Sequence, residues 1–186
     1  MLVDRCRALA DAWERLGHGP AVPAYASVVL RFDPLRLDRS DAERAVTDAL
    51  ASAAPTAPAA ARTVEIPTRY DGPDLAATAQ ASGLTTSELV ELHSTREYVA
   101  FFLGFLPGFA YCGTLDPRIV APRLERPRER VRAGAVAVAD GQTAIYPFDS
   151  PGGWRILGST SLVIFDAARE PAALIHAGDR VRFVPQ

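Results

Sequence analysis

A two-residue turn between alternating apolar residues constrains the fold of this chain more than any other segment. Residues 136–139 (VAVA) and 142–146 (QTAIY) are separated only by Asp140 and Gly141. An Asp-Gly pair adopts the positive φ angles that a two-residue hairpin turn requires. The segment therefore predicts two paired antiparallel strands.

Further short strands are expected on both sides of this hairpin. Residues 155–157, 161–165 and 179–184 have strand composition, and in the last of these Val181 and Phe183 alternate with arginines. Many short strands separated by turn residues over about 90 positions favour a closed barrel or a sandwich.

The N-terminal third has a different pattern. Cys6, Leu9, Trp13 and Leu16 are spaced as one face of a helix that Gly17 ends. Residues 27–32 read as a strand, and Ser40 with Glu43 has capping-box spacing before a helix that reaches about residue 50. Helix, strand and helix predict a small α/β unit.

Small residues and two prolines over residues 51–61 supply little that could pack, so we place a linker there. The predicted domains are 1–62 and 63–186. The second is expected to begin with a strand at 63–67, a helix over 73–82, and a short helix that Thr85 and Glu88 cap and that ends near His93.

Composition excludes several kinds of chemistry. All 20 basic residues are arginine, so the chain has no lysine for a Schiff base or a P-loop. A net charge of -2 and interspersed arginines argue against a nucleic-acid partner. No window is apolar enough to span a membrane, and a cytoplasmic protein is expected. Three scattered histidines and two distant cysteines predict neither a metal site nor a disulfide framework.

Two stretches alternate glycine or proline with aromatic residues: 104–111 (GFLPGFAY) and 150–154 (SPGGW). Glycine allows close approach, proline fixes the shape of a loop, and an aromatic ring gives a flat apolar wall. Such bends can form a rigid pocket for a small molecule. From composition alone, the favoured interpretation is that they are tight corners whose rings plug the ends of a barrel.

Three polar residues near these bends are candidates for chemistry. His93 has an ordinary pKa near working pH and suits an acid/base or carbonyl-orienting role, although a histidine at a helix end can simply bond the last carbonyl groups. Gln142 and Tyr146 are four residues apart on one predicted strand and share a face, so they suit an amide-like ligand or a buried hydrogen-bonded pair.

Other familiar sites are weaker candidates. No G-x-S-x-G motif supports a serine nucleophile. Six arginines over residues 118–132 include Arg123 and alternate with prolines and acids, so one or two could grip a carboxylate or phosphate while most form a solvated face.

The order of these motifs resembles a known family. GFLPGFAYCGTLDPR (104–118), the pairs Pro122-Arg123 and Pro127-Arg128, AGAVAVADGQTAIYPFDSPGGW (133–154) and GDRVRFVP (178–185) are similar to the KipI and 5-oxoprolinase B-subunit family. This family is also called allophanate hydrolase subunit 1, or carboxyltransferase subdomain C/D.

The resemblance implies an α+β chain in which a small N-terminal α/β domain precedes a cyclophilin-like β-barrel. Family members generally begin with a strand before the first helix, whereas this chain begins within two or three residues of that helix; either the N-terminal sheet lacks an edge strand or the start of the sequence is misassigned. The implied function is that of the B-subunit of a 5-oxoprolinase, which opens 5-oxoproline to L-glutamate with ATP. The partners would be an A-subunit plus a KipA-like C-subunit, and ATP would be used by the complex rather than bound by this chain alone.

The resemblance also supplies the candidate site. The residues that match its motifs, together with Arg123, are His93, Phe105, Pro107, Gly108, Phe109, Tyr111, Arg123, Gln142, Tyr146, Ser150, Pro151, Gly152, Gly153 and Trp154. We expect the two bends to meet at a barrel mouth beside His93 and to form half of a cleft that another polypeptide completes.

Two other functions fit the same family. One is a KipI-type inhibitor that binds a sensor histidine kinase through the barrel surface and needs no His93. The other is a carboxyltransferase or allophanate hydrolase type of subunit that acts on amides derived from urea.

Overall fold

The computed structural model describes residues 2–53 and 62–186. The chain divides into two compact units, Met1–Ala60 and Ala61–Gln186, and each is described by itself. Most of the linker predicted over 51–61 lies outside the described residues, although Ala51 and Ser52 continue the second helix.

The N-terminal unit packs two helices with a two-stranded antiparallel sheet. Trp13 is fully buried with Ala45 and Ala49 of the second helix, and its indole N–H donates to the carbonyl of Arg31 at 3.0 Å. One strand was not predicted, because its three residues end in Pro23 and carry little strand signal. The elements are α1 (Leu2–Arg15), β1 (Ala21–Pro23), β2 (Val28–Leu30) and α2 (Arg39–Ser52).

The prediction that Ser40 caps α2 is wrong, because the cap is Asp38. The backbone of Asp38 is extended, and its carboxylate accepts from the amide of Asp41 at 2.7 Å. Ser40 already lies inside the helix and donates its hydroxyl to the same carboxylate. Asp38 therefore satisfies an amide at the helix start that would otherwise lack a partner.

The second unit is built on a seven-stranded sheet that is nearly closed. The strand order is β10-β7-β8-β5-β4-β11-β3, and a bridge between Arg69 and Ser159 joins the ends of the two edge strands. The predicted α+β fold with a barrel is therefore confirmed. Its strands are β3 (Thr63–Thr68), β4 (Tyr98–Leu103), β5 (Ala110–Gly113), β7 (Ala135–Ala139), β8 (Gln142–Ile145), β10 (Arg155–Ser159) and β11 (Arg180–Pro185).

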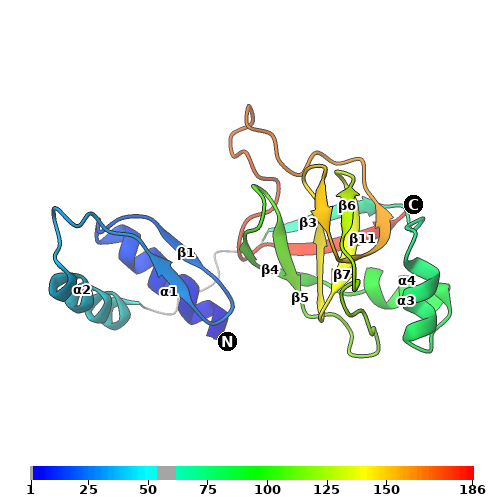
Figure 1. Cartoon of the computed structure of the whole chain (residues 1–186), viewed down its shortest axis with the longest axis horizontal. Helices are drawn as coiled ribbons and strands as arrows, with labels where there is room; N and C mark the ends of the chain where they lie inside the picture. Colours follow the sequence, from blue (N-terminus) through cyan, green and yellow to red (C-terminus); the bar gives the residue numbers. More distant parts are fainter. Residues whose placement is uncertain (1, 54–61) are drawn as a thin grey trace. The chain divides into compact units, whose positions relative to one another are not determined.

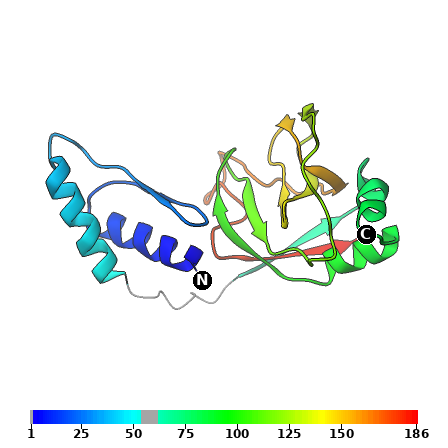
Figure 2. The ribbon, with the colours of Figure 1, turned by 60° about the horizontal axis from the view of Figure 1, so that its bottom comes forward.

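Two helices and a separate ribbon complete this unit. α3 (Leu75–Ala81) and α4 (Thr86–Ser94) pack on each other near the C-terminus, with α4 against β11 and α3 against β10 (Figures 1 and 2). The capping box of Thr85 and Glu88 is present as predicted. β6 (Arg128–Val131) and β9 (Ser150–Gly152) pair as a two-stranded antiparallel ribbon.

The central hairpin has the predicted geometry. β7 pairs with β8 in regular register, and the turn residues Asp140 and Gly141 have φ angles of 50° and 81°. Both positive angles are those of a type I′ turn, whose twist matches that of the flanking strands. The turn residues alone therefore account for the geometry at which the two strands are joined.

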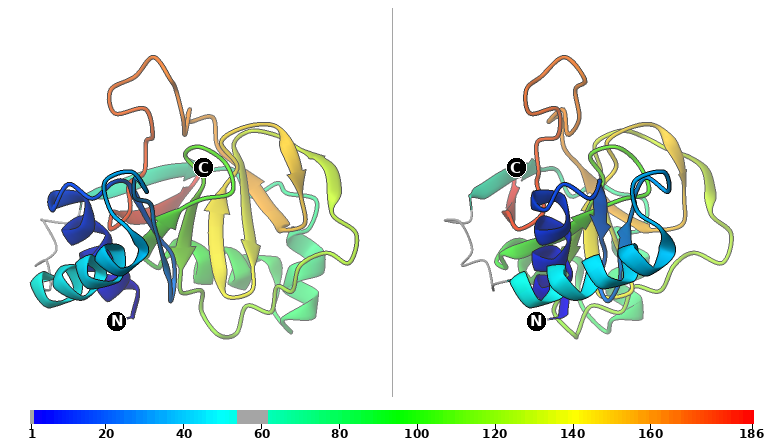
Figure 3. Two further views of the ribbon diagram at one scale, coloured as in Figure 1. Left: turned by 60° about the vertical axis from the view of Figure 1, so that its left-hand side comes forward. Right: turned by 90° about the vertical axis from the view of Figure 1, so that its left-hand side faces the viewer.

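The prediction of a strand over 161–165 is wrong, because the chain there runs in a projecting loop (Figures 1 and 3). Phe165 makes a single bridge to Ala173. The guanidinium of Arg169 donates to the carbonyl groups of Val163 and Ile164 at 3.2 and 3.3 Å, and to those of Pro171 and Ala172 at 3.2 and 2.8 Å. Arg169 thus donates hydrogen bonds to carbonyl groups that would accept from the N–H groups of a neighbouring strand if this segment lay in a sheet.

We predict that Arg169→Lys loosens this loop and leaves the barrel intact. A lysine keeps the charge but lacks the planar fork, so the loop loses about 1–3 kcal/mol of local stability. Amide hydrogen exchange should speed up at Asp166 and Leu174, whose N–H groups bond within the loop. Arg132→Lys, at an exposed position, is the control, and equal exchange in both variants would contradict the assignment.

Candidate functional site

The structure brings the two aromatic bends together. The ring centroid of Trp154 lies 5.6 Å from that of Phe109 and 5.8 Å from that of Tyr111, and Phe109 lies 5.3 Å from Tyr146. All three pairs meet edge to face, which is a favourable arrangement for aromatic rings. Phe109, Tyr146 and Trp154 are each at most 4% exposed. We call these four residues the aromatic cluster.

The hairpin forms the floor of this cluster because its side chains alternate in size. Ala135, Ala137 and Ala139 of β7 pack with the rings, whereas Val136 and Val138 point into the barrel core. On β8, Ala144 joins the aromatic side and Ile145 the barrel core. Methyl groups leave room for broad rings against the sheet, and the larger valines fill the barrel.

The two phenylalanines of the first bend meet edge to face, with ring centroids 5.4 Å apart, but differ in exposure. Phe109 is buried, whereas Phe105 is 62% exposed and has a φ of 70°, which is unusual for a residue with a side chain. Gly108 is buried beside Phe165, with a φ of 79°. Pro107 is exposed. The bend therefore presents one ring outward and one inward.

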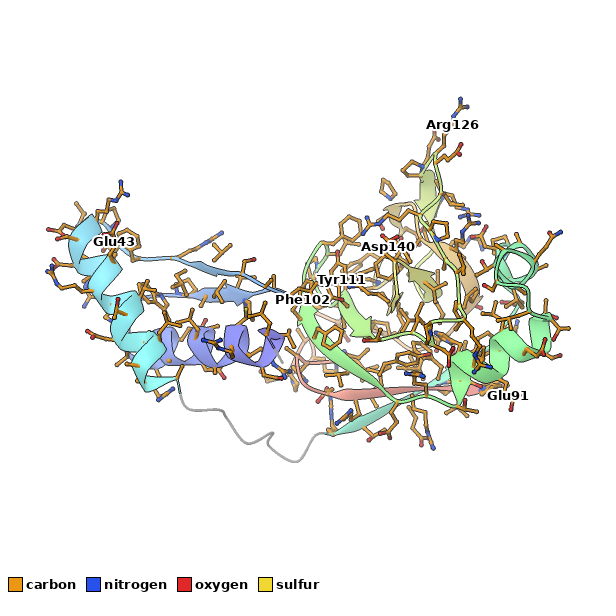
Figure 4. The ribbon with its side chains drawn as sticks, turned by 90° about the horizontal axis from the view of Figure 1, so that it is seen from below. Glu43, Glu91, Phe102, Tyr111, Arg126 and Asp140 are labelled. Carbon is orange, nitrogen blue, oxygen red and sulfur yellow. The ribbon has the colours of Figure 1, made fainter. Side chains whose placement is uncertain are left out.

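Arg123 lies at the edge of the cluster. Its guanidinium carbon is 5.9 Å from the ring centroid of Trp154, and its Nε donates to Asp140 at 2.9 Å. Nearby, Phe102 stacks on Tyr111 with centroids 4.6 Å apart, and both rings are partly exposed (Figure 4). Phe102 was missed in the sequence because it stands inside a strand rather than in a bend.

His93 does not join the aromatic cluster. Its ring is fully buried on the barrel side of the hairpin, 4.5 Å from the ring of Phe183, with Nε2 2.9 Å from the Thr143 hydroxyl and Nδ1 2.7 Å from that of Tyr70. Thr143 points into the barrel, while Ala144 and Tyr146 point to the aromatic side. The expectation that His93 lies beside the bends is therefore wrong, since a helix position does not determine which face of a distant sheet a side chain reaches.

The hydrogen bonds around His93 fix its protonation. Thr143 donates its hydroxyl proton to the carbonyl of Ala137 at 3.2 Å, so its oxygen accepts from Nε2–H of His93. Nδ1 then accepts from Tyr70, which is partly exposed. Burial lowers the pKa of His93 to about 3, so the imidazole is neutral at working pH.

Gln142 and Tyr146 share the aromatic face of β8, as the spacing predicts. Gln142 is partly buried at the turn end, whereas Tyr146 is 1% exposed. Burial raises the pKa of the Tyr146 phenol, and a hydrogen bond from the backbone of Trp154 opposes this shift. Tyr146 therefore holds the second bend in place from beneath.

The second bend consists of β9 and the two residues that follow it, Gly153 and Trp154. Ser150 is buried and pairs with Val131 of β6, and Gly152 pairs with Arg128. Pro151 is exposed, and Gly152 and Gly153 are partly exposed. The expectation of a mostly solvated arginine segment misses Arg128, which donates to the buried carboxylate of Asp74 at 2.7 Å.

Neither a metal cluster nor a membrane span is found in the part of the chain that the structure describes. No group of three or more His, Cys, Asp or Glu side chains there could hold a metal ion. The described helices are too short or too polar to cross a bilayer. A surface hollow of about 470 Å³ lies away from the bends, lined by Tyr70, Leu75 and residues of α4.

Comparison with known proteins identifies related sequences. A family model for the carboxyltransferase domain, subdomain C and D, matches residues 2–175. A 5-oxoprolinase B-subunit from Escherichia coli O157:H7 is 50% identical over 128 residues, covering 67% of this chain and 59% of the relative. The protein of that name from Bacillus subtilis strain 168 is 36% identical over 176 residues, covering 88% and 73%. The chain thus spans 59% of the length of the Escherichia coli relative.

Solved structures show the same architecture. TTHA0988 superposes with a TM-score of 0.87 at 41% identity, covering all of this chain and 37% of that one. PH0987 from Pyrococcus horikoshii gives 0.65 at 40% identity, covering 100% and 88%. The urea amidolyase of Kluyveromyces lactis gives 0.78 at 17% identity, covering 100% of this chain and 13% of that one, and shares the fold alone.

We predict that His93 makes the barrel less stable in acid. The unfolded imidazole has a pKa of about 6.5, so between that pH and about 3 the unfolded chain binds a proton that the folded chain excludes. The free energy of unfolding should fall by up to about 1.4 kcal/mol per pH unit as the pH drops through this window.

Urea unfolding of a Trp13→Phe background measures this effect, because Trp154 is then the one tryptophan and reports on the barrel. His93→Gln should lose about 2–4 kcal/mol at neutral pH and show a shallower fall in acid. His176→Gln, at a partly exposed position, should keep the steep fall. Equal slopes in wild type and His93→Gln would contradict a buried neutral imidazole.

Proposed function

The chain belongs to the family of the carboxyltransferase domain, subdomain C and D, and on this premise we propose that it is the B-subunit of an ATP-dependent 5-oxoprolinase. The observation that carries the proposal is the 50% and 36% identity to two proteins of that name. The reaction would open 5-oxoproline to L-glutamate. The likeness to urea amidolyase supports no second function, because at 17% identity it concerns the fold.

Companion polypeptides fit the chemistry of this chain. A lactam carbonyl is a poor electrophile, and phosphorylation by ATP would activate it. The sequence has no lysine to form a P-loop, so we assign ATP binding to a KipA-like C-subunit or to an A-subunit. This chain would then supply part of the substrate site and be inactive alone.

The aromatic cluster would contribute shape and exclusion of water. Its rings rest on an alanine floor and contact one another edge to face, so little freedom is lost when a ligand binds beside them. Gln142, on the same face, offers an amide that can pair with a lactam N–H and C=O. Tyr146 would act mainly through the backbone of Trp154, to which it is hydrogen-bonded.

His93 would be a positioning residue rather than an acid or base. It holds Thr143, which lies between Gln142 and the buried end of β8. The imidazole is fully buried and neutral, and its single N–H is held by Thr143, so it has neither access to substrate nor a free proton to donate. Its role would be to fix the strand that carries Gln142.

Reconstitution tests the proposed function. The purified chain should release glutamate from 5-oxoproline only when it is combined with the A-subunit, the KipA-like C-subunit, ATP and substrate together. The chain alone should release none. Undiminished activity after this chain is omitted would refute its role in the complex.

Gln142 gives a sharper test within the same assay. Gln142→Leu keeps the size of the side chain but removes both amide groups, so kcat/KM for 5-oxoproline should fall by about tenfold or more. Gln80→Leu, an exposed position on α3, is the matched control and should have no effect. Equal activity of the two variants would remove Gln142 from the site.

A further inference from the structure

The β6–β9 ribbon contains buried hydrogen-bond donors that lack acceptors. Among the described residues, the buried side-chain atoms without a partner are the Thr78 hydroxyl, Nη1 of Arg128 and the Ser150 hydroxyl. Two of the three lie on this ribbon, on opposite strands. An unpaired buried polar group costs about 1–3 kcal/mol. Two such donors on one ribbon therefore indicate that a bound molecule accepts hydrogen bonds from them.

A third hydroxyl, that of Tyr146, lies against this ribbon at Gly152. The hydroxyl of Tyr146 is so close to Gly152 that a Cβ added there would lie 2.2 Å from it. Gly152 is the cross-strand partner of Arg128. The backbone of Trp154 donates to the Tyr146 oxygen, and a phenol that accepts one hydrogen bond can also donate its own hydrogen.

Asp74 accepts one hydrogen bond at each of its carboxylate oxygens, and neither bond comes from Nη1 of Arg128. Oδ1 of Asp74 accepts from Nη2 of Arg128 at 2.7 Å, and Oδ2 accepts from the amide of Ile156, also at 2.7 Å. Asp74 is buried and orients the guanidinium, so Nη1 is held in place without a partner. Such a fixed guanidinium loses little entropy on binding an anion.

We propose that this ribbon binds the carboxylate of a small molecule, with Arg128, Ser150 and Tyr146 as its donors. An anion with two oxygens matches a guanidinium and two hydroxyls better than a neutral carbonyl does. The partly exposed Gly152 and Gly153 place this part of the ribbon at the surface, where Gly152 packs on the Tyr146 phenol and Gly153 lies near Pro127. Identification of the molecule as 5-oxoproline rests on the proposed function, whereas the carboxylate site itself does not.

Binding to the full chain alone tests this site. Isothermal titration should detect 5-oxoproline, and 2-pyrrolidone, the same lactam without the carboxylate, should bind at least about tenfold more weakly. Acetate should compete with 5-oxoproline. Equal binding of the two lactams would overturn the proposal. So would the absence of binding by both lactams and by acetate, and a buried water would then be the partner of these donors.

Ser150→Ala separates binding from folding. It removes a hydroxyl that has no partner in the free protein, so the melting temperature should not fall. The affinity for 5-oxoproline should drop about fivefold to tenfold. Unchanged affinity in this variant would contradict the site.

Arg128→Gln should reduce the affinity further, although it also leaves Asp74 without its ion pair. Arg130→Gln is the matched control on the same strand, because its guanidinium is exposed and paired with Asp149. It should bind 5-oxoproline as the wild type does.

The outcomes distinguish this site from the proposed function. Suppose that carboxylate binding depends on Ser150 but the chain never supports glutamate release. This result would support the site and refute the 5-oxoprolinase role. An active complex whose KM for 5-oxoproline is the same in Ser150→Ala and Arg128→Gln would support the role and refute the site.

Discussion

The structure of the barrel unit depends on one hairpin that is buried on both faces. β7 and β8 meet at a type I′ turn, and their side chains alternate between the barrel core and the aromatic cluster. A shift of one residue in register would send the valines toward the rings and the alanines into the barrel. The difference in size between the valines and the alanines therefore determines the packing of both the barrel core and the aromatic cluster.

This division decides which groups can perform chemistry. His93 belongs to the barrel side, where it is neutral and bonded through both nitrogens. Gln142 and the aromatic cluster lie on the other face of the hairpin, and Tyr146 of that cluster packs against Gly152 of the β6–β9 ribbon. In the function proposed above, a chain with an apolar aromatic wall and no lysine would bind substrate, and companion subunits would supply the ATP chemistry.

Features set by local patterns could be predicted from the sequence. The Asp-Gly turn, the capping box of Thr85 and the alternation in β11 were all found, because each depends on neighbouring residues. Features set by distant contacts could not. Three features depend on partners that spacing does not reveal. They are the side of the sheet that His93 reaches, the pairing of Arg128 with Asp74, and the loop around Arg169 in place of a strand over 161–165.

The most direct test of this account is the protonation of His93 in solution. Imidazole nitrogen shifts of the ¹⁵N-labelled chain should show His93 as the neutral Nε2–H tautomer from about pH 7 down to about pH 4, with no titration in that range. Titration of His93 near pH 6.5 would show that its ring reaches solvent. The division of the hairpin into a barrel side and an aromatic side would then be wrong.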